Sequence, residues 1–261
     1  MEKININNIS LSYETKGQGS DILLLHGFPS NMYMWNEIKK ELIENGYRVT
    51  IVEQRGYPLS RLKNFDPLSF NIEELSKDVE ELILKLNLDK NLTIVGHDWG
   101  SIVAWAVISR EKVNINKLIS VCGGTEFPIS AVYNNLTYNE KLHYISSFQN
   151  VKESANIVDS NLELFFRSAY RMNNQIGESV DLSLENVFIN NLSERCVMKE
   201  NEIINLIQHF DKFSLDQPIA WYANIDFNSK LSSAWRKVVT TPIHFLFGEV
   251  DAAVKLNDKV R

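Results

Sequence analysis

The sequence predicts an α/β fold, in which a mostly parallel β-sheet carries helices on both faces. Short apolar runs alternate with helical patterns over the first 125 of the 261 residues. Such alternation implies right-handed crossovers between parallel strands. One of the apolar runs, Asp21–Leu25, is short and continuous, as expected of a buried strand of a parallel sheet. The chain is long enough for one large domain with an insertion.

Each predicted element rests on a hydrophobic period and on the residues that end it. Ile4–Tyr13 alternates apolar and polar residues before the turn at Gly17–Gly19, which indicates one half-exposed strand. The other predicted strands are Asp21–Leu25, Tyr47–Val52, Leu92–Val95, Lys117–Cys122 and Ile243–Phe247, and the first and last of these are expected to be buried. The predicted helices are Trp35–Ile43, Ile72–Leu86 and Ser101–Ser109.

The pattern changes between residues 126 and 231. Strand-like runs disappear there, and aromatic-rich helical spacing replaces them, as in Leu162, Phe165 and Phe166. We therefore expect the first part of the core at residues 1–125, a helical cap at 126–231 and the second part of the core at 232–261. The cap is thus inserted after a core strand.

Composition and charge argue against several classes of function. A net charge of −6 disfavours nucleic acid and anionic membranes as partners. Cys122 and Cys196 lie far apart and match no metal-ligand spacing, so we expect free thiols, a reducing compartment, and neither a metal nor a cofactor. No stretch has the length of a membrane span, and the N-terminus has no apolar leader. We expect a cytoplasmic protein, and no pattern indicates its oligomeric state.

The segment Gly96-His97-Asp98-Trp99-Gly100 carries the strongest chemical signal. It joins a predicted strand to a predicted helix and places Asp98 between small residues, which is the layout of a nucleophile elbow. Glycines let the backbone close tightly, and a helix that starts at Trp99 directs its positive end at the reacting centre. A carboxylate nucleophile makes an alkyl ester with its substrate. The alternative is that Asp98 only caps the helix.

A second motif, His26-Gly27-Phe28-Pro29, also follows a predicted buried strand. In this architecture that loop supplies one donor of the oxyanion hole. We expect the hole to consist of the backbone N–H groups of Phe28 and Trp99. Pro29 fixes the turn and has no N–H of its own. We interpret His26 as a structural histidine of the loop.

Together with Glu53-Gln54-Arg55-Gly56-Tyr57, these motifs resemble the epoxide hydrolase branch of the α/β-hydrolase superfamily. The resemblance covers essentially the whole chain. It implies an α/β-hydrolase core with a helical cap, and a small apolar epoxide or related electrophile as substrate. Asp98 would open the epoxide, and water would hydrolyse the resulting ester to a vicinal diol. Glu53 and Pro58 depart from the family pattern, but both are expected in a loop and change none of these roles.

The resemblance also implies two cap tyrosines that donate hydrogen bonds to the epoxide oxygen. Tyr222, in Ala220-Trp221-Tyr222-Ala223-Asn224, resembles one of them. Tyr144 resembles the other, with Tyr133 and Tyr138 as alternatives. In a segment this aromatic, any one of these rings could instead serve only packing.

The family further implies an acid that orients a catalytic histidine. Asp251, after the last predicted strand, resembles that acid, with Glu249 and Glu126 as alternatives. The chain ends ten residues past Asp251, before the Gly-His-Trp-like segment that the family would place there. We therefore expect the chain to be truncated, without the last strand, the last helix and the general base, and to stall at the ester. The strand Ile243–Phe247 would then present an apolar edge. The histidines judged unsuitable as substitutes are His26, His97, His143, His209 and His244.

Two other functions remain open from the sequence. A haloalkane dehalogenase would use the same Asp98-Trp99 pair, but that family commonly has asparagine where this chain has Phe28. Halide release from a brominated alkane would separate the two reactions. A catalytically inactive homologue would still form an apolar pocket for a small ligand.

Overall fold

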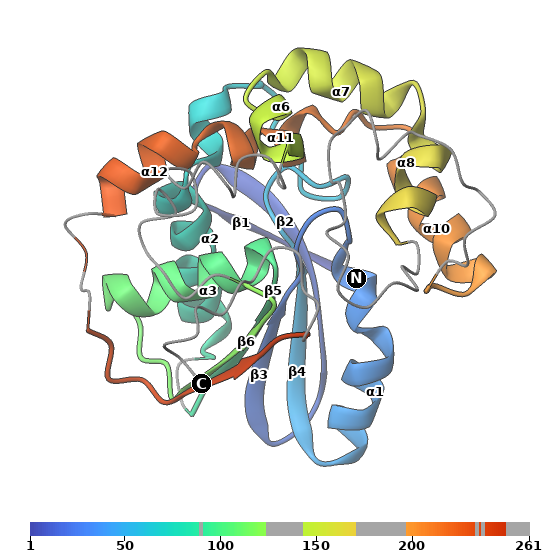
Figure 1. The fold of residues 1–261 in the computed structure, drawn as a ribbon. Helices are drawn as coiled ribbons and strands as arrows, with labels where there is room; N and C mark the ends of the chain where they lie inside the picture. Colours follow the sequence, from blue (N-terminus) through green and yellow to red (C-terminus); the bar gives the residue numbers. More distant parts are fainter. Residues whose placement is uncertain (89–90, 124–142, 171–196, 233–234, 236–237, 249–261) are drawn as a thin grey trace.

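A computed structural model describes the chain except for residues 89–90, 124–142, 171–196, 233–234, 236–237 and 249–261. Figure 1 shows a twisted sheet with α1 on one face, α2 and α3 on the other, and further helices over one end. Within the described ranges the sheet has seven strands in the order β1-β2-β4-β3-β5-β6-β7. β2 runs antiparallel to β1 and β4, and the pairs from β4 to β7 are parallel. The predicted fold class is confirmed.

The elements agree with most of the predicted ranges. The strands are β1 Glu2–Ile6, β2 Ile9–Gly17, β3 Ser20–Leu25, β4 Tyr47–Glu53, β5 Thr93–His97, β6 Lys117–Val121 and β7 Ile243–Leu246. The core helices are η1 Met32–Trp35, α1 Asn36–Glu44, η2 Pro67–Phe70, α2 Ile72–Leu86 and α3 Trp99–Arg110. The upper helices, as we call them, are α6 His143–Ser147, α7 Val151–Asp159, α8 Leu162–Ala169, α10 Glu200–Phe210, α11 Asp216–Ala223 and α12 Ile225–Ser232. The predicted boundaries of the core and cap domains stay predictions.

Two sequence predictions are wrong in detail. The single strand predicted at Ile4–Tyr13 is a hairpin, because Asn7 and Asn8 adopt φ values of 37° and 61° and pair Ile6 with Ile9. Asparagine tolerates such angles better than most residues. β7 is half-exposed rather than buried, and Leu246 is 54% exposed. The reason is that β7 pairs only with β6 among the described strands.

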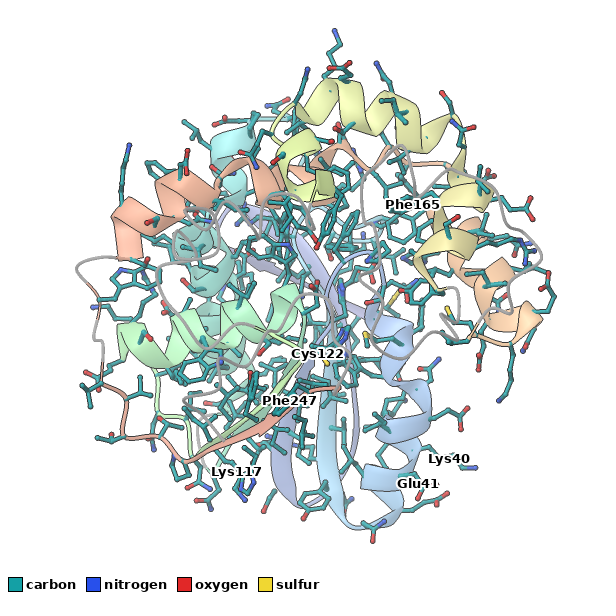
Figure 2. The ribbon with its side chains drawn as sticks, viewed as in Figure 1. Lys40, Glu41, Lys117, Cys122, Phe165 and Phe247 are labelled. Carbon is teal, nitrogen blue, oxygen red and sulfur yellow. The ribbon has the colours of Figure 1, made fainter. Side chains whose placement is uncertain are left out.

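Two apolar clusters hold the layers together. The larger lies between the sheet and α2 and α3, and it continues into the upper helices. The smaller lies under α1, where Leu42 and Ile43 pack against Met32 and other core residues. Figure 2 shows Lys40 of this helix on the outer surface of the molecule. The amphipathic pattern of α1 therefore covers one face of the sheet, while the larger cluster fixes the position of the upper helices.

A buried ion pair joins the loop after β4 to α2. Arg55 donates from Nε and Nη2 to the Asp78 carboxylate at 2.7 and 2.6 Å, and Asn7 donates to it at 2.9 Å. The side chains of Arg55 and Asp78 are 3% and 4% exposed. Burial raises the pKa of Asp78 to about 6, although the hydrogen bonds from Arg55 oppose this shift. Asp78 is therefore largely charged at neutral pH only while Arg55 accompanies it.

Replacement of Arg55 by methionine is expected to lower the free energy of unfolding by about 3–5 kcal/mol at pH 7, because it leaves Asp78 buried without its partner, and the carboxyl must then either stay charged or take up a proton at a pH above its ordinary pKa. At pH 5 the Asp78 carboxyl can take up a proton, so the loss should be smaller there. Urea unfolding at both pH values measures the effect. Arg167→Met, which breaks the exposed pair of Arg167 with Glu200, is the control and should change stability far less. Equal losses in both variants would refute the argument.

Candidate active site

Asp98 lies in the tight turn between β5 and α3, with φ 53° and ψ −124°. The turn can close because two of its residues, Gly96 and Gly100, are glycines without a side chain. A Cβ on Gly96 would lie 2.5 Å from the Gly100 carbonyl oxygen, and a Cβ on Gly100 would lie 2.2 Å from the Leu25 carbonyl oxygen. The backbone N–H of Ser101 then donates to the Asp98 carbonyl oxygen at 2.9 Å. The local sequence therefore dictates a strained turn that holds Asp98 at the end of the sheet.

The Asp98 side chain is directed at the loop after β3. The backbone N–H of Phe28 donates to Asp98 Oδ1 at 2.7 Å. This close approach requires Gly27, since a Cβ there would lie 2.4 Å from the same oxygen. Within the described residues the Asp98 side chain makes no capping hydrogen bond to α3. The geometry thus differs from that of a simple helix cap, and it places one predicted oxyanion donor on the carboxylate. Trp99, the other predicted donor, is the first residue of α3.

An aromatic layer from the upper helices covers this point. Tyr222 of α11 is 3% exposed, and its ring centroid lies 5.4 Å from that of Phe28 and 5.2 Å from that of Trp99. Tyr144 of α6 lies 5.7 Å from Tyr222, and Phe148 lies 5.1 Å from it. The structure thus places the two predicted tyrosines side by side above the elbow. The alternatives at positions 133 and 138 lie outside the described residues.

The surroundings of Tyr222 keep its phenol protonated. Burial raises the pKa of Tyr222 well above its ordinary value of 10, and the charges of Tyr144 and Asp98 raise it further. A side-chain hydrogen bond with Trp99 opposes the shift without reversing it. The hydroxyl is therefore a hydrogen-bond donor over the whole neutral and moderately alkaline range.

His26 has a structural role in the loop after β3. Its Nε2 accepts from the Gln54 backbone N–H at 3.0 Å, and its Nδ1 lies 3.2 Å from the Gly27 carbonyl oxygen. Burial lowers the pKa of His26 to about 4, so the ring is neutral. It links the loop that carries Phe28 to the residues that follow β4.

Asp251 lies outside the described residues, as do Glu249 and Glu126.

Two contacts that sequence reasoning missed hold the upper helices over the core. Glu53, expected in a loop, is instead the last residue of β4 and is fully buried. It accepts from the Met32 backbone N–H at 3.2 Å and lies 2.5 Å from Nε2 of His209 in α10. Trp221, next to Tyr222, donates from Nε1 to the Arg55 carbonyl oxygen at 3.1 Å. The Glu53-Gln54-Arg55 segment therefore positions α10 and α11.

Other types of site find no support among the described residues. They contain no group of three or more His, Cys, Asp or Glu side chains that could hold a metal ion. None of the described helices is both long enough and apolar enough to span a bilayer.

Comparison with known proteins agrees with this geometry. Residues 22–149 match a family described as having the alpha/beta hydrolase fold. An epoxide hydrolase mutant from Vigna radiata superimposes with a TM-score of 0.85 at 20% identity, over 97% of this chain and 81% of the other. The chain is an α/β-hydrolase-fold protein. Potato (Solanum tuberosum) epoxide hydrolase I has the same fold, with a TM-score of 0.75, 23% identity, and 97% and 82% coverage.

Curated proteins that are similar to this chain include epoxide hydrolases. Epoxide hydrolase 1 of Caenorhabditis elegans is 28% identical over 98% of this chain and 60% of its own length. AB hydrolase superfamily protein YfhM of Bacillus subtilis is 39% identical over 45% of this chain and 41% of its own length. The chain thus spans less than two thirds of the length of these relatives. Its resemblance to epoxide hydrolases, which the motifs predicted, is confirmed.

Proposed function

We propose that this α/β-hydrolase opens epoxides by attack of Asp98 on a ring carbon. The hydrogen bond from Phe28 to Asp98 Oδ1 is the observation that carries the proposal, because it fixes the carboxylate in one orientation. The other carboxylate oxygen then forms the new bond to carbon. The ring C–O bond breaks, and its electrons pass to the epoxide oxygen. The product of this step is an alkyl ester of Asp98.

The upper helices act as the cap in this proposal, and they supply the proton. As the ring opens, negative charge develops on the epoxide oxygen. Tyr222 and Tyr144 lie together above the elbow, and one of them donates its hydroxyl proton to that oxygen. The high pKa of Tyr222 keeps this proton available, whereas a phenolate could only repel the developing charge. Tyr222 and Tyr144 are thus assigned as donors, and Phe28 and Trp99 as the oxyanion hole for the ester.

Hydrolysis of the ester is proposed to be the slower step. Water must lose a proton as it attacks the ester carbonyl, and a histidine usually accepts it. His26 already uses both ring nitrogens, and His209 is paired with Glu53. His244 is exposed on β7, and His97 is the last residue of β5, directly before the turn that holds Asp98. Among these described histidines none is placed as the base, and Asp251 stays a candidate for its orienting acid.

Intact mass measurement after incubation with styrene oxide tests both parts of the proposal. The expected result is a rise by the mass of one epoxide, on the peptide that contains Asp98, with little diol. Sustained diol formation without a stable adduct would refute slow hydrolysis. The absence of both adduct and diol would refute epoxide opening.

Phe28 favours an epoxide over a haloalkane. Its side chain has no donor for a halide, and its ring packs against Phe148 and Tyr222 at centroid distances of 5.4 Å. Incubation with 1-bromobutane should therefore release no bromide. An inactive binding protein would bind styrene oxide without an adduct, and Asp98→Asn would leave that binding unchanged.

A further inference from the structure

Tyr57 is a buried phenol that the proposed reaction does not use. It is fully buried, and its hydroxyl has no hydrogen-bond partner among the described residues. A buried donor without an acceptor destabilises the folded state. One explanation of such an unpaired group is a binding site, in which a ligand provides the missing partner.

The Tyr57 ring is held in place from two sides. Its centroid lies 4.4 Å from that of His26 and 5.8 Å from that of Trp221, both in edge-on contact. Its backbone closes a turn in which the Tyr57 N–H donates to the Gln54 carbonyl oxygen at 3.2 Å and the Ser60 N–H donates to Tyr57 at 2.8 Å. The hydroxyl cannot swing toward solvent without displacing these neighbours.

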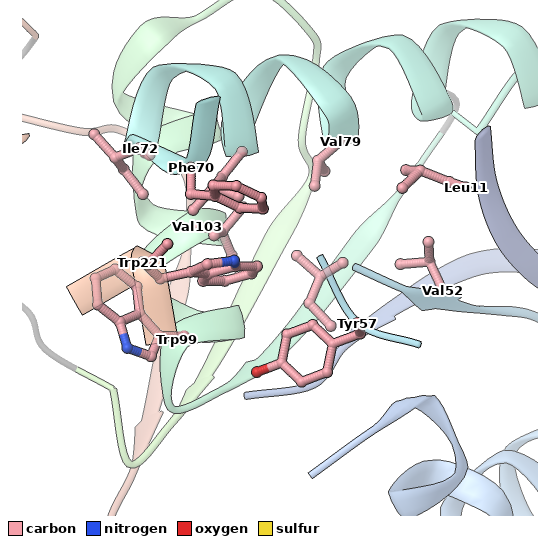
Figure 3. Packing of buried hydrophobic residues seen from close by; sticks show 14 of the residues in the cluster. Leu11, Val52, Tyr57, Phe70, Ile72, Val79, Trp99, Val103 and Trp221 are labelled. Atoms are coloured by element: carbon pink, nitrogen blue, oxygen red, sulfur yellow. The ribbon is translucent and has the colours of Figure 1, made fainter. Parts of the chain in front are cut away.

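The hydroxyl is directed at the region of the elbow. Figure 3 shows that it leaves the ring on the side where Trp99 lies. Burial raises the pKa of Tyr57 well above 10, and the next largest contribution is the charge of Asp98, so the carboxylate is within electrostatic reach. Tyr57 is therefore a further phenol near Asp98, besides Tyr222 and Tyr144.

Two aromatic rings of the upper helices contact Tyr57, which favours a largely apolar ligand. Trp221 and Phe210 pack against its ring at centroid distances of 5.8 and 6.1 Å. We propose that the Tyr57 hydroxyl donates a hydrogen bond to an oxygen on the substituent of the epoxide, so that the substrates are aryl or alkyl epoxides with an ether, hydroxyl or carbonyl oxygen close to the ring. This inference rests on the proposed opening of epoxides by Asp98.

A pair of substrates that differ in one atom tests this inference. Phenyl glycidyl ether has an ether oxygen where 4-phenyl-1,2-epoxybutane has a methylene, with nearly the same shape. For each variant, intact mass measurement gives the rate of adduct formation with each of the two substrates, and the rate with the ether is divided by the rate with the methylene compound. Comparison between variants cancels the intrinsic reactivity of the two epoxides. In Tyr57→Phe the ether-to-methylene ratio should fall about tenfold from that of the wild type, the effect of one buried hydrogen bond.

Tyr13→Phe is the matched control. The Tyr13 hydroxyl donates to Glu2 at 3.1 Å and takes no part in the elbow, so this variant should keep the wild-type ratio. Tyr57→Phe should also raise the melting temperature of the free protein, because it removes an unpaired hydroxyl. A hydroxyl with a purely structural role would lower it. An unchanged ratio, or a lower melting temperature, would overturn the inference.

Failure of the chemistry can be separated from failure of the inference. If neither epoxide gives an adduct or a diol, epoxide opening is refuted, and the same substrate pair is then compared by equilibrium binding, measured through tryptophan fluorescence. A preference for the ether that Tyr57→Phe abolishes would support the donor role even then. Equal affinities in the wild type would overturn it.

Discussion

Replacement of Asp98 by asparagine is expected to abolish the covalent adduct. The rate of ring opening should fall by at least about 10⁴-fold, as is typical when a nucleophile is removed. An amide oxygen carries no full charge with which to attack carbon. The fold should persist, because asparagine has nearly the same size and shape as the aspartate it replaces in this turn, and its oxygen can still accept from Phe28. A time course of intact mass with styrene oxide, alongside urea unfolding, measures both effects.

Asp66→Asn is the matched control for this substitution. Asp66 is an exposed carboxylate that accepts from the Leu68 backbone N–H at 3.1 Å at the start of η2. The variant should form the adduct at the wild-type rate. If Asp98→Asn retained an adduct, peptide mapping would place the nucleophile at another carboxylate, and the assignment of the elbow would be wrong.

The parts of the fold that sequence predicted well are specified by neighbouring residues. The predicted helix at Ile72–Leu86 coincides with α2, since Asn71 caps it through its side chain and Asn87 ends it with φ 53°. The elbow was found for the same reason, because its glycines and Asp98 lie within five residues. The missed hairpin had a local signal as well, in the Asn7-Asn8 pair, which the alternating pattern on either side obscured.

The parts that could not be predicted depend on partners far along the chain. Glu53 and His209 are 156 residues apart, and the Trp221 to Arg55 contact spans 166 residues. Nothing in either residue type indicates which other residue it meets, because many side chains can pair with a glutamate or a tryptophan. The unpaired hydroxyl of Tyr57 is equally invisible in the sequence, since the lack of a partner follows from the packing of every surrounding element.

Replacement of Tyr222 by phenylalanine is expected to slow ring opening by about 100-fold, because the epoxide oxygen loses its protonated donor. The wild-type rate should also stay level from pH 7 to pH 10. The raised pKa of Tyr222 means that its phenol remains protonated across this range, and activity falls only when the pH exceeds that raised value. The rate of adduct formation as a function of pH measures both effects. Tyr33→Phe is the control, because Tyr33 is exposed on η1, and this variant should form the adduct at the wild-type rate.

The two tyrosines should not contribute equally. Tyr222 is buried against Phe28 and Trp99, whereas Tyr144 is half-buried and meets the elbow through Tyr222. Tyr144→Phe should therefore slow adduct formation less than Tyr222→Phe does. The rate loss of the double variant should be smaller than the product of the two single losses, because both hydroxyls donate to one oxygen. If the rate loss of the double variant equals the product of the two single losses, the tyrosines act independently. An unchanged rate in Tyr144→Phe would transfer the second donor to Tyr133 or Tyr138.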